Sequence, residues 1–405
     1  MEEIKFTIII PTRERSDVLA PALKSVLNQD YANFEIIVSD NYSCDDTEKI
    51  VASFKSDKVR YINTGKRVGM SQNWEFALDH VTSGWVAIIG DDDALLNNAL
   101  SKVAELINLT GSKCIRSDTC GFLWPGLNGS DHGTLSIPLK SGWTERKSEI
   151  WIEKILSGKA GYANLPQVYN GGFVDFDVLK DIKSKSGRYI HSMNPDLYLG
   201  MAIASELPSY VYSMEPFVIN GASWHSGGTS AFSSKSSSKN SPSNKFANED
   251  NIDFHHDLPL CCDGKVVHSL QASAYEVYLQ SKHLRKINIF EDHQKQLQVI
   301  LSVNDGIHRE SVEAWGEQFA ALHCLDLPNA IKSSKGDIFF LKLRKGLRAM
   351  FSFLNRYVVH GDTYPLNDVY DAAIVASTII NVKPSRQKMF LEAIKRGIKK
   401  LKIAT

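Results

Sequence analysis

Three consecutive aspartates, Asp91, Asp92 and Asp93, follow an apolar stretch of the chain. Like charges side by side raise one another's pKa unless a positive charge neutralises them. A divalent cation would do this and could bridge to a diphosphate, because Mg²⁺ and Mn²⁺ prefer oxygen ligands and keep substrate phosphate in their shell. On an extended segment Asp91 and Asp93 point to one side, so that pair can face the metal. An acidic turn that caps the next helix is the alternative, but the apolar stretch favours the metal site.

Polar residues also follow two earlier apolar stretches. Pro11, Thr12 and Arg13 come after the first, and an arginine can clamp a diphosphate with two parallel hydrogen bonds. Asp40 ends the second, where its carboxylate could accept a hydrogen bond from the ring N–H of a uracil-like base. Each has a simpler alternative: Arg13 could be a surface residue paired with Glu14, and Asp40 could be a turn residue.

Further candidates lie in loops and near a helix start. Arg67, in a basic glycine-flanked loop, could contact a base or a phosphate, or could lie in a solvated turn. Asp196 precedes an apolar helix, so it would either cap that helix or act as a general base toward an acceptor hydroxyl; Glu206 is a weaker candidate. Trp224 could stack on a sugar ring. His225 could bind metal or phosphate, although a lone histidine is more often a core or surface residue.

The first hundred residues alternate between strand and helix patterns. We expect strands at Phe6–Ile10, Phe34–Val38, Val59–Ile62 and Trp85–Ile89. We expect helices at Leu19–Leu27, with Ser16 or Asp17 as the cap, and at about 45–54, 70–80 and 97–109. This alternation predicts an α/β fold with a mostly parallel sheet covered by helices on both faces. Ligands of such sheets bind beyond the carboxyl ends of the strands. Thr12, Asp40 and the aspartate cluster should therefore line one crevice.

The rest of the chain has a different pattern. A strand is expected at Gln167–Val174 and helices at Ser148–Leu156 and Asp196–Glu206. Residues 229–251 are serine-rich and of low complexity, which predicts a mobile loop. From about His268 onward the pattern is helical. We therefore place a boundary near residue 255, between a domain at 1–255 and a helical region at 256–405.

Composition excludes several classes of protein. The 405 residues contain 46 basic and 46 acidic side chains, so net charge gives no support for a nucleic-acid partner. None of the six cysteines forms a C-x-x-C motif, which argues against zinc and redox sites and fits reduced thiols in the cytoplasm. The start has no secretory pattern, and the apolar run Ala372–Val382 is too short to span a bilayer. Neither a dinucleotide-binding glycine motif nor a P-loop is present, which argues against an oxidoreductase or an NTPase.

The C-terminal stretch 386–403 predicts a basic amphipathic helix. Such a helix can lie peripherally on an anionic membrane surface, or it can pack on the protein body with a solvated basic face. A second basic stretch with large apolar residues, Leu341–Tyr357, favours contact with a membrane or a lipid-linked acceptor. We therefore expect a cytoplasmic protein that can contact the inner face of the membrane.

An ordered set of motifs over about residues 5–110 resembles family 2 glycosyltransferases. The motifs are FTIIIPTRER at 6–15, LKSVLNQDY at 23–31, FEIIVSDN at 34–41, GMSQNWEFA at 69–77 and IIGDDD at 88–93. The resemblance implies a GT-A fold and an inverting, single-displacement mechanism. It also implies a nucleotide-diphosphate sugar donor and a bound Mg²⁺ or Mn²⁺ ion.

By position in these motifs, Asp40 would hold the base and Thr12 would line the nucleotide pocket. Asp93 would be the direct metal ligand. Asp196 follows a proline and resembles the acid that opens a helix and acts as the base in some members. The chain has Ser39 where the family often has aspartate, and the Glu–Asp pair of many members is not evident.

These expectations give two functional hypotheses. The first is sugar transfer to a hydroxyl of a saccharide or lipid-linked acceptor, in the synthesis of a surface polysaccharide such as O-antigen or capsule. The second is a catalytically inactive protein that binds a nucleotide-sugar or serves as a scaffold. The aspartate cluster favours the first.

Overall fold

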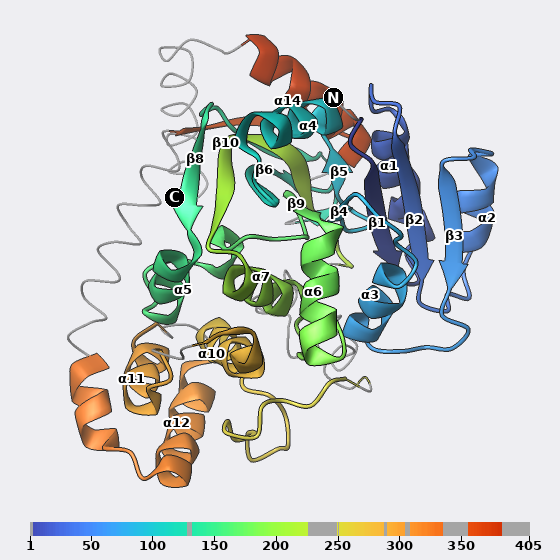
Figure 1. Cartoon of the computed structure of the whole chain (residues 1–405). Coiled ribbons are helices and arrows are strands. Elements are labelled where there is room, and N and C mark those ends of the chain that lie inside the picture. Colours follow the sequence, from blue (N-terminus) through green and yellow to red (C-terminus); the bar gives the residue numbers. More distant parts are fainter. Residues whose placement is uncertain are drawn as a thin grey trace.

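The structure is a computed structural model that describes residues 3–127, 132–225, 249, 251–286, 290–303, 308–334 and 355–382. One sheet runs through the molecule with helices on both faces, and a group of helices packs beyond one of these layers (Figure 1). Within the described ranges, no helix has both the length and the apolar composition needed to cross a bilayer. Most of the serine-rich segment and all of the basic stretch 386–403 lie outside them, so both expectations stay predictions.

The N-terminal part of the sheet is parallel, in the order β4-β1-β2-β3. Its strands are β1 (Phe6–Thr12), β2 (Phe34–Asp40), β3 (Val59–Asn63) and β4 (Trp85–Ile88). The helices between and after them are α1 (Ser16–Leu27), α2 (Thr47–Ser53), α3 (Met70–Leu78) and α4 (Ala99–Thr110). These eight elements confirm the predicted alternation.

The remaining strands make the sheet as a whole mixed. They are β5 (Ala94–Leu95), β6 (Cys114–Leu123), β7 (Thr134–Pro138), β8 (Trp143–Lys147), β9 (Gly172–Asp175) and β10 (Ser209–Ala222). β9 lies antiparallel between β4 and β6. The strand expected at Gln167–Val174 begins only at Gly172, because Asn170 and Gly171 take positive φ angles of 49° and 98° and turn the chain.

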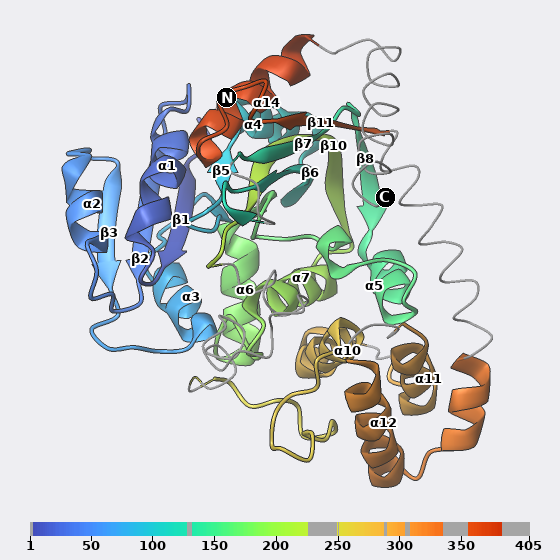
Figure 2. The same cartoon turned by 180° about the vertical axis from the view of Figure 1, so that it is seen from behind.

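The later helices form the second layer and the C-terminal group. They are α5 (Ser148–Leu156), α6 (Phe176–Ser186), α7 (Pro195–Glu206), α10 (Leu270–Gln280), α11 (His293–Val303), α12 (Arg309–His323) and α14 (Val369–Val382). Helices α10 to α12 lie beyond α5, α6 and α7 in both views (Figures 1 and 2). The predicted α/β fold with a mainly helical C-terminal region is confirmed.

The core is divided by the sheet, because successive side chains of a strand point to opposite faces. In β1, Ile9 packs with α3, α6 and α7 on one face. Phe6, Ile8 and Ile10 pack with α1 and α4 on the other. Both faces are buried, which explains why the parallel strands read as continuous apolar runs.

Part of the C-terminal region returns to the sheet. Strand β11 (Arg356–His360) pairs antiparallel with β7, and α14 packs on α1, where Tyr370 Oη accepts a hydrogen bond of 2.8 Å from Asn28 Nδ2. The Ser377 hydroxyl accepts a hydrogen bond of 3.0 Å from the Asn97 amide, just before α4. The boundary near residue 255 stays a prediction, and residues 356–382 belong to the sheet layers in space.

Candidate active site

The aspartate cluster forms a turn between β4 and β5. The amide of Asp93 donates to the carbonyl of Gly90 at 3.1 Å, so the segment is not extended and the expected alternation of side chains does not apply. All three carboxylates are buried, with Asp91 2%, Asp92 5% and Asp93 1% exposed. The cluster is therefore not a solvated acidic turn.

Each carboxylate of the turn has its own anchor. Asp91 accepts hydrogen bonds from Thr12 Oγ1 at 2.8 Å and Arg15 Nη1 at 2.7 Å. Asp92 accepts from the hydroxyl of Ser223 at 2.6 Å. These contacts join the turn to the loop after β1 and to the residues after β10.

Asp93 is held by backbone amides. Its two oxygens accept from the N–H groups of Gly90 at 2.7 Å and Gly221 at 2.8 Å. Gly221 has no room for a side chain, since a Cβ there would lie 1.8 Å from the carbonyl oxygen of Asp92. The close approach of β10 therefore depends on glycine, and it fixes the orientation of the Asp93 carboxylate.

The buried turn carries more negative charge than its neighbours neutralise. Burial, followed by repulsion from Asp92, raises the pKa of Asp93 to about 8. Burial also raises the pKa of Asp91, even though Arg15 lowers it. A divalent cation would relieve this excess charge, so the donor set fits Mg²⁺ or Mn²⁺.

The turn is not a closed metal cage. Among the described residues, only His255, His256 and Asp257 form a group of three whose ligand atoms all lie within 4.8 Å of one another. That group precedes α10 and lies outside the cluster. Mg²⁺-type ions are usually held by one or two carboxylates together with substrate phosphate, and the open cluster is compatible with such a site.

Thr12 and Asp40, which are predicted to bind the nucleotide, lie at the same edge of the sheet as the aspartate cluster. β1 and β2 pair in register with Thr12 opposite Asp40, and the Asn41 amide donates to the Thr12 carbonyl at 3.0 Å. Asp40 accepts from Ser43 Oγ at 2.6 Å and from Tyr61 Oη at 2.6 Å. The expected convergence is thus confirmed as geometry, and the roles of the residues stay predictions.

The other predicted nucleotide contacts lie around this edge. Pro11 is in β1, opposite Ser39 of β2. Arg13 forms an ion pair with Glu249 and not with Glu14. Arg67 is exposed, and its guanidinium lies 3.9 Å from the Glu14 carboxylate. Both arginines are thus positioned at the rim, where they remain candidates for contact with phosphate or base.

The predicted base Asp196 is the second residue of α7. Asn194 holds the N-cap position, so Asp196 is not the cap residue. Its Oδ2 accepts a hydrogen bond of 2.9 Å from Tyr162 Oη. Burial raises the pKa of Asp196, which moves this carboxyl toward the range useful for proton transfer near neutral pH.

Tyr169 lies beside the end of β4. Its backbone bridges to Ile88, the last residue of β4 and two residues before Gly90. Burial raises the pKa of its phenol well above the usual value, and the charges of Asp93, Asp92 and Asp196 raise it further. Asp196 and the aspartate cluster thus both act electrostatically on the Tyr169 phenol.

Trp224 and His225 lie beside the cluster. Trp224 is 50% exposed and packs edge-to-face against Trp124 with ring centroids 6.5 Å apart. The Trp124 indole N–H donates to the Asp92 carbonyl at 3.1 Å. The His225 ring lies 3.0 Å from Asp17 Oδ2, so it faces the start of α1 and not the aspartate cluster. Its role as a metal ligand stays a prediction.

Sequence reasoning missed several residues of the site. Arg15 lies in the first motif but was not singled out, although it joins Asp91 to the carbonyl oxygen of His225 at 2.7 Å. Tyr162, Tyr169 and Ser223 carry no local signal, because their contacts come from segments remote in sequence. Only the tertiary structure brings them to the cluster.

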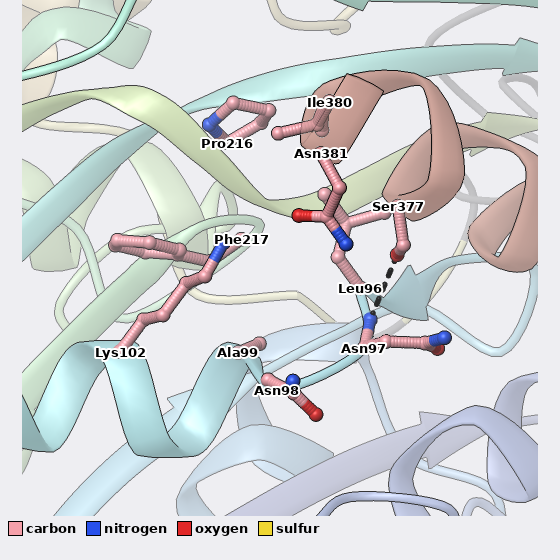
Figure 3. A pocket seen from close by; sticks show the side chains of 10 residues that line it. All are labelled: Leu96, Asn97, Asn98, Ala99, Lys102, Pro216, Phe217, Ser377, Ile380 and Asn381. Carbon is pink, nitrogen blue, oxygen red and sulfur yellow. Dashed lines mark hydrogen bonds between the residues drawn. The ribbon is translucent and has the colours of Figure 1, made fainter. Parts of the chain in front are cut away.

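A shallow pocket lies elsewhere, between the start of α4, the bend in β10 and the end of α14 (Figure 3). The Asn97 amide and the Ser377 hydroxyl meet across it. None of its lining residues is a predicted site residue. It is therefore distinct from the candidate active site.

The Arg15–Asp91 pair gives a stability prediction. We expect Arg15→Ala to lower the free energy of unfolding by about 2 kcal/mol, because it leaves the buried Asp91 carboxylate without its cation. Denaturant unfolding in the presence of a chelator measures this. Arg67→Ala, which removes an exposed cation, is the control and should change little. Adding Asp91→Asn to Arg15→Ala should restore most of the loss, and no recovery would contradict the assigned cause.

Comparison with known proteins identifies the N-terminal segment. The family model described as Glycosyl transferase family 2 matches residues 7–116. A Campylobacter jejuni GalNAc(5)-diNAcBac-PP-undecaprenol beta-1,3-glucosyltransferase is 37% identical over 107 residues, covering 26% of this chain and 35% of the relative. The Escherichia coli UDP-Glc:alpha-D-GlcNAc-diphosphoundecaprenol beta-1,3-glucosyltransferase WfgD is 27% identical over 100 residues, covering 25% and 40%. The matches thus span well under half of these relatives.

Solved structures are similar over more of the chain, at low identity. S. aureus TarS 1–349 in complex with UDP-GlcNAc shares 18% identity and covers 85% of this chain and 92% of its own, with a TM-score of 0.45. The mannosyltransferase PcManGT from Pyrobaculum calidifontis, in complex with GDP-Man and Mn²⁺, shares 12% identity and covers 95% and 88%, with a TM-score of 0.38.

The matched segment contains the residues predicted to bind the nucleotide and the metal, from Pro11 through Asp40 to Asp93. Asp196, Trp224 and His225 lie beyond it. Residues 7–116 of this chain are thus similar to glycosyl transferase family 2.

Proposed function

We propose that the chain is an inverting glycosyltransferase that moves a sugar from a nucleotide-diphosphate donor to a hydroxyl of a saccharide or lipid-linked acceptor. The observation that carries this is a pair of acidic groups: the buried Asp91–Asp93 turn, whose Asp91 accepts from Thr12 and Arg15, and the Asp196 carboxyl, which accepts from Tyr162. One group is suited to a metal-bound diphosphate and the other to a proton acceptor. Sugar transfer by single displacement needs both.

On the donor side, Asp40 accepts a hydrogen bond from the base and Thr12 lines the nucleotide pocket beside Asp91. Arg13 and Arg67 contribute positive charge at the rim. Asp93, with Asp91, would hold Mg²⁺ or Mn²⁺, which when bound supplies positive charge to the leaving diphosphate. Arg15 keeps Asp91 paired and fixes its orientation.

On the acceptor side, Asp196 takes the proton of the attacking hydroxyl. The acceptor oxygen forms a bond to the anomeric carbon, the bond from that carbon to the diphosphate oxygen breaks, and the configuration inverts. The Tyr162 hydroxyl donates to Asp196 Oδ2 and so orients the carboxylate. The half-exposed Trp224 offers an aromatic face for a sugar ring.

The acceptor class is supported by the named relatives, two of which are described as transferases on undecaprenol-diphosphate-linked substrates. We infer a lipid-linked saccharide acceptor and a role in surface polysaccharide synthesis. Such an acceptor places the reaction at the inner face of a membrane. The basic stretch 386–403, which is outside the described residues, is the candidate membrane contact.

A panel of nucleotide-sugars tests the proposal. With Mn²⁺ and a polyprenyl-diphosphate-linked saccharide, we expect one donor to release its nucleoside diphosphate in proportion to glycosylated acceptor, and a chelator to stop the release. Metal-dependent binding of a donor without turnover would instead support the inactive binding protein. Absence of both binding and turnover across the panel would contradict the proposed function.

A further inference from the structure

Glu276 of α10 is a buried carboxyl that has no role in the transfer reaction proposed above. It lies where the C-terminal helices contact α7. Glu276 of α10 is 0% exposed, and its Oε2 accepts a hydrogen bond of 2.7 Å from Ser192 Oγ. Oε1 is buried, and the Gln280 side chain and the His255 backbone also act on the carboxyl and lower its pKa. Burial raises the pKa of Glu276 to about 7, which reflects the cost of removing the carboxylate from water.

From Glu276 a chain of hydrogen bonds leads to the start of α7. Ser192 Oγ donates to Glu276 and accepts from the Asn194 amide at 3.3 Å. Asn194 is the N-cap residue of α7, and its carbonyl accepts from the Tyr198 amide at 2.9 Å. The helix that begins here carries Asp196 as its second residue. The position of Asp196 thus depends on how this loop is held.

The same loop is held from its other side by α3. The Ser71 hydroxyl donates to the Ser192 carbonyl at 2.7 Å, and Glu75 Oε1 accepts from the Ile190 amide at 2.6 Å. α3 belongs to the family segment, whereas α10 belongs to the C-terminal helices. The loop before α7 is therefore fixed between the nucleotide-binding part and the C-terminal part.

We propose that Glu276 is a positioning residue for the transfer reaction, which through Ser192 holds the start of α7 so that Asp196 is aligned with the acceptor hydroxyl. The inference rests on the proposed function. A buried carboxyl destabilises a fold more than an apolar residue of similar size, so simple packing does not explain it. A catalytic base, by contrast, must be positioned accurately, because a displacement of about 1 Å can lower the rate on the order of 100-fold.

The test uses Ser192→Ala, Glu276→Ala and Glu276→Gln in the full chain. We expect Ser192→Ala and Glu276→Ala to lower kcat by at least about tenfold, while KM for the donor and affinity for the nucleoside diphosphate stay unchanged, because α7 and not the donor site is displaced. Glu276→Gln keeps a carbonyl oxygen that accepts from Ser192 and should restore most of the kcat lost in Glu276→Ala.

Ser209→Ala is the matched control, since it removes another Ser–Glu hydrogen bond, 2.6 Å to Glu145, that lies after the end of α7 and not at its start. Amide hydrogen exchange at residues 192–198 gives a readout that does not need activity. It should accelerate in Ser192→Ala and stay unchanged in Ser209→Ala. Unchanged exchange in Ser192→Ala, or wild-type kcat in that variant, would overturn the inference. A wild-type chain that turns over no donor would overturn the proposed function, and hydrogen exchange would still decide the positioning.

Discussion

Asp196→Asn should reduce sugar transfer by about 1,000-fold while leaving donor binding intact, since a positioned general base contributes roughly 100- to 10,000-fold to such reactions. The amide of asparagine keeps the shape and can still accept the Tyr162 hydrogen bond, but it cannot take the acceptor proton. Single-turnover transfer and equilibrium binding of the nucleoside diphosphate, measured on the same preparation, separate the two effects. In the wild type, the rate of transfer should rise with pH as Asp196 loses its proton. Because burial raises the pKa of Asp196, this rise should occur at a higher pH than for an ordinary aspartate.

A carboxylate on the same helix provides the control. Glu206, at the end of α7, forms an ion pair with Lys185 and was the weaker candidate for the base. Glu206→Gln should retain transfer close to that of the wild type. If Asp196→Asn transferred sugar at a near-normal rate, or if Glu206→Gln lost as much, the base would have to lie elsewhere.

The nucleotide side was predictable from sequence because its residues sit at the ends of adjacent parallel strands. Apolar runs ending at Pro11 and Ser39 locate two strand ends, and in-register parallel pairing then places Thr12 opposite Asp40. The Asp91–Asp93 turn follows β4, the other neighbour of β1. Strand period and topology are enough for this inference, and no side-chain detail is needed.

The acceptor side was less predictable, because its contacts join segments far apart in sequence. Asp196 was found by its position before a helix, but nothing local indicates that Tyr162 donates to it. The anchoring of Asp93 depends on Gly221 in β10, a strand that sequence patterns did not reveal, and that strand is irregular between Ser213 and Val218. Long-range pairing of this kind is set by packing and not by local propensity.

Asp93→Asn should abolish the metal-dependent part of donor binding. We expect the affinity for nucleoside diphosphate in Mn²⁺ to fall by about 100-fold, toward the value that the wild type shows in a chelator, because a neutral amide is a poor ligand for a hard divalent ion. Isothermal titration with and without Mn²⁺ measures this. Asp175→Asn, which alters a partly buried carboxylate beside the start of β4, is the control and should leave binding unchanged.

Stability distinguishes a lost metal ligand from a damaged turn. In the metal-free wild type, the raised pKa of Asp93 means that its ionisation near neutral pH costs folding free energy, and the neutral side chain of Asp93→Asn removes part of that cost. The loss of one acceptor for the amides of Gly90 and Gly221 acts in the opposite direction. The metal-free variant should therefore have a Tm near that of the wild type.

Mn²⁺ with nucleoside diphosphate should raise the Tm of the wild type only, since a ligand at 100 times its Kd adds about 2.7 kcal/mol. A variant that is strongly destabilised without metal, yet still stabilised by Mn²⁺, would show that Asp93 holds the turn and that the ion binds to its neighbours.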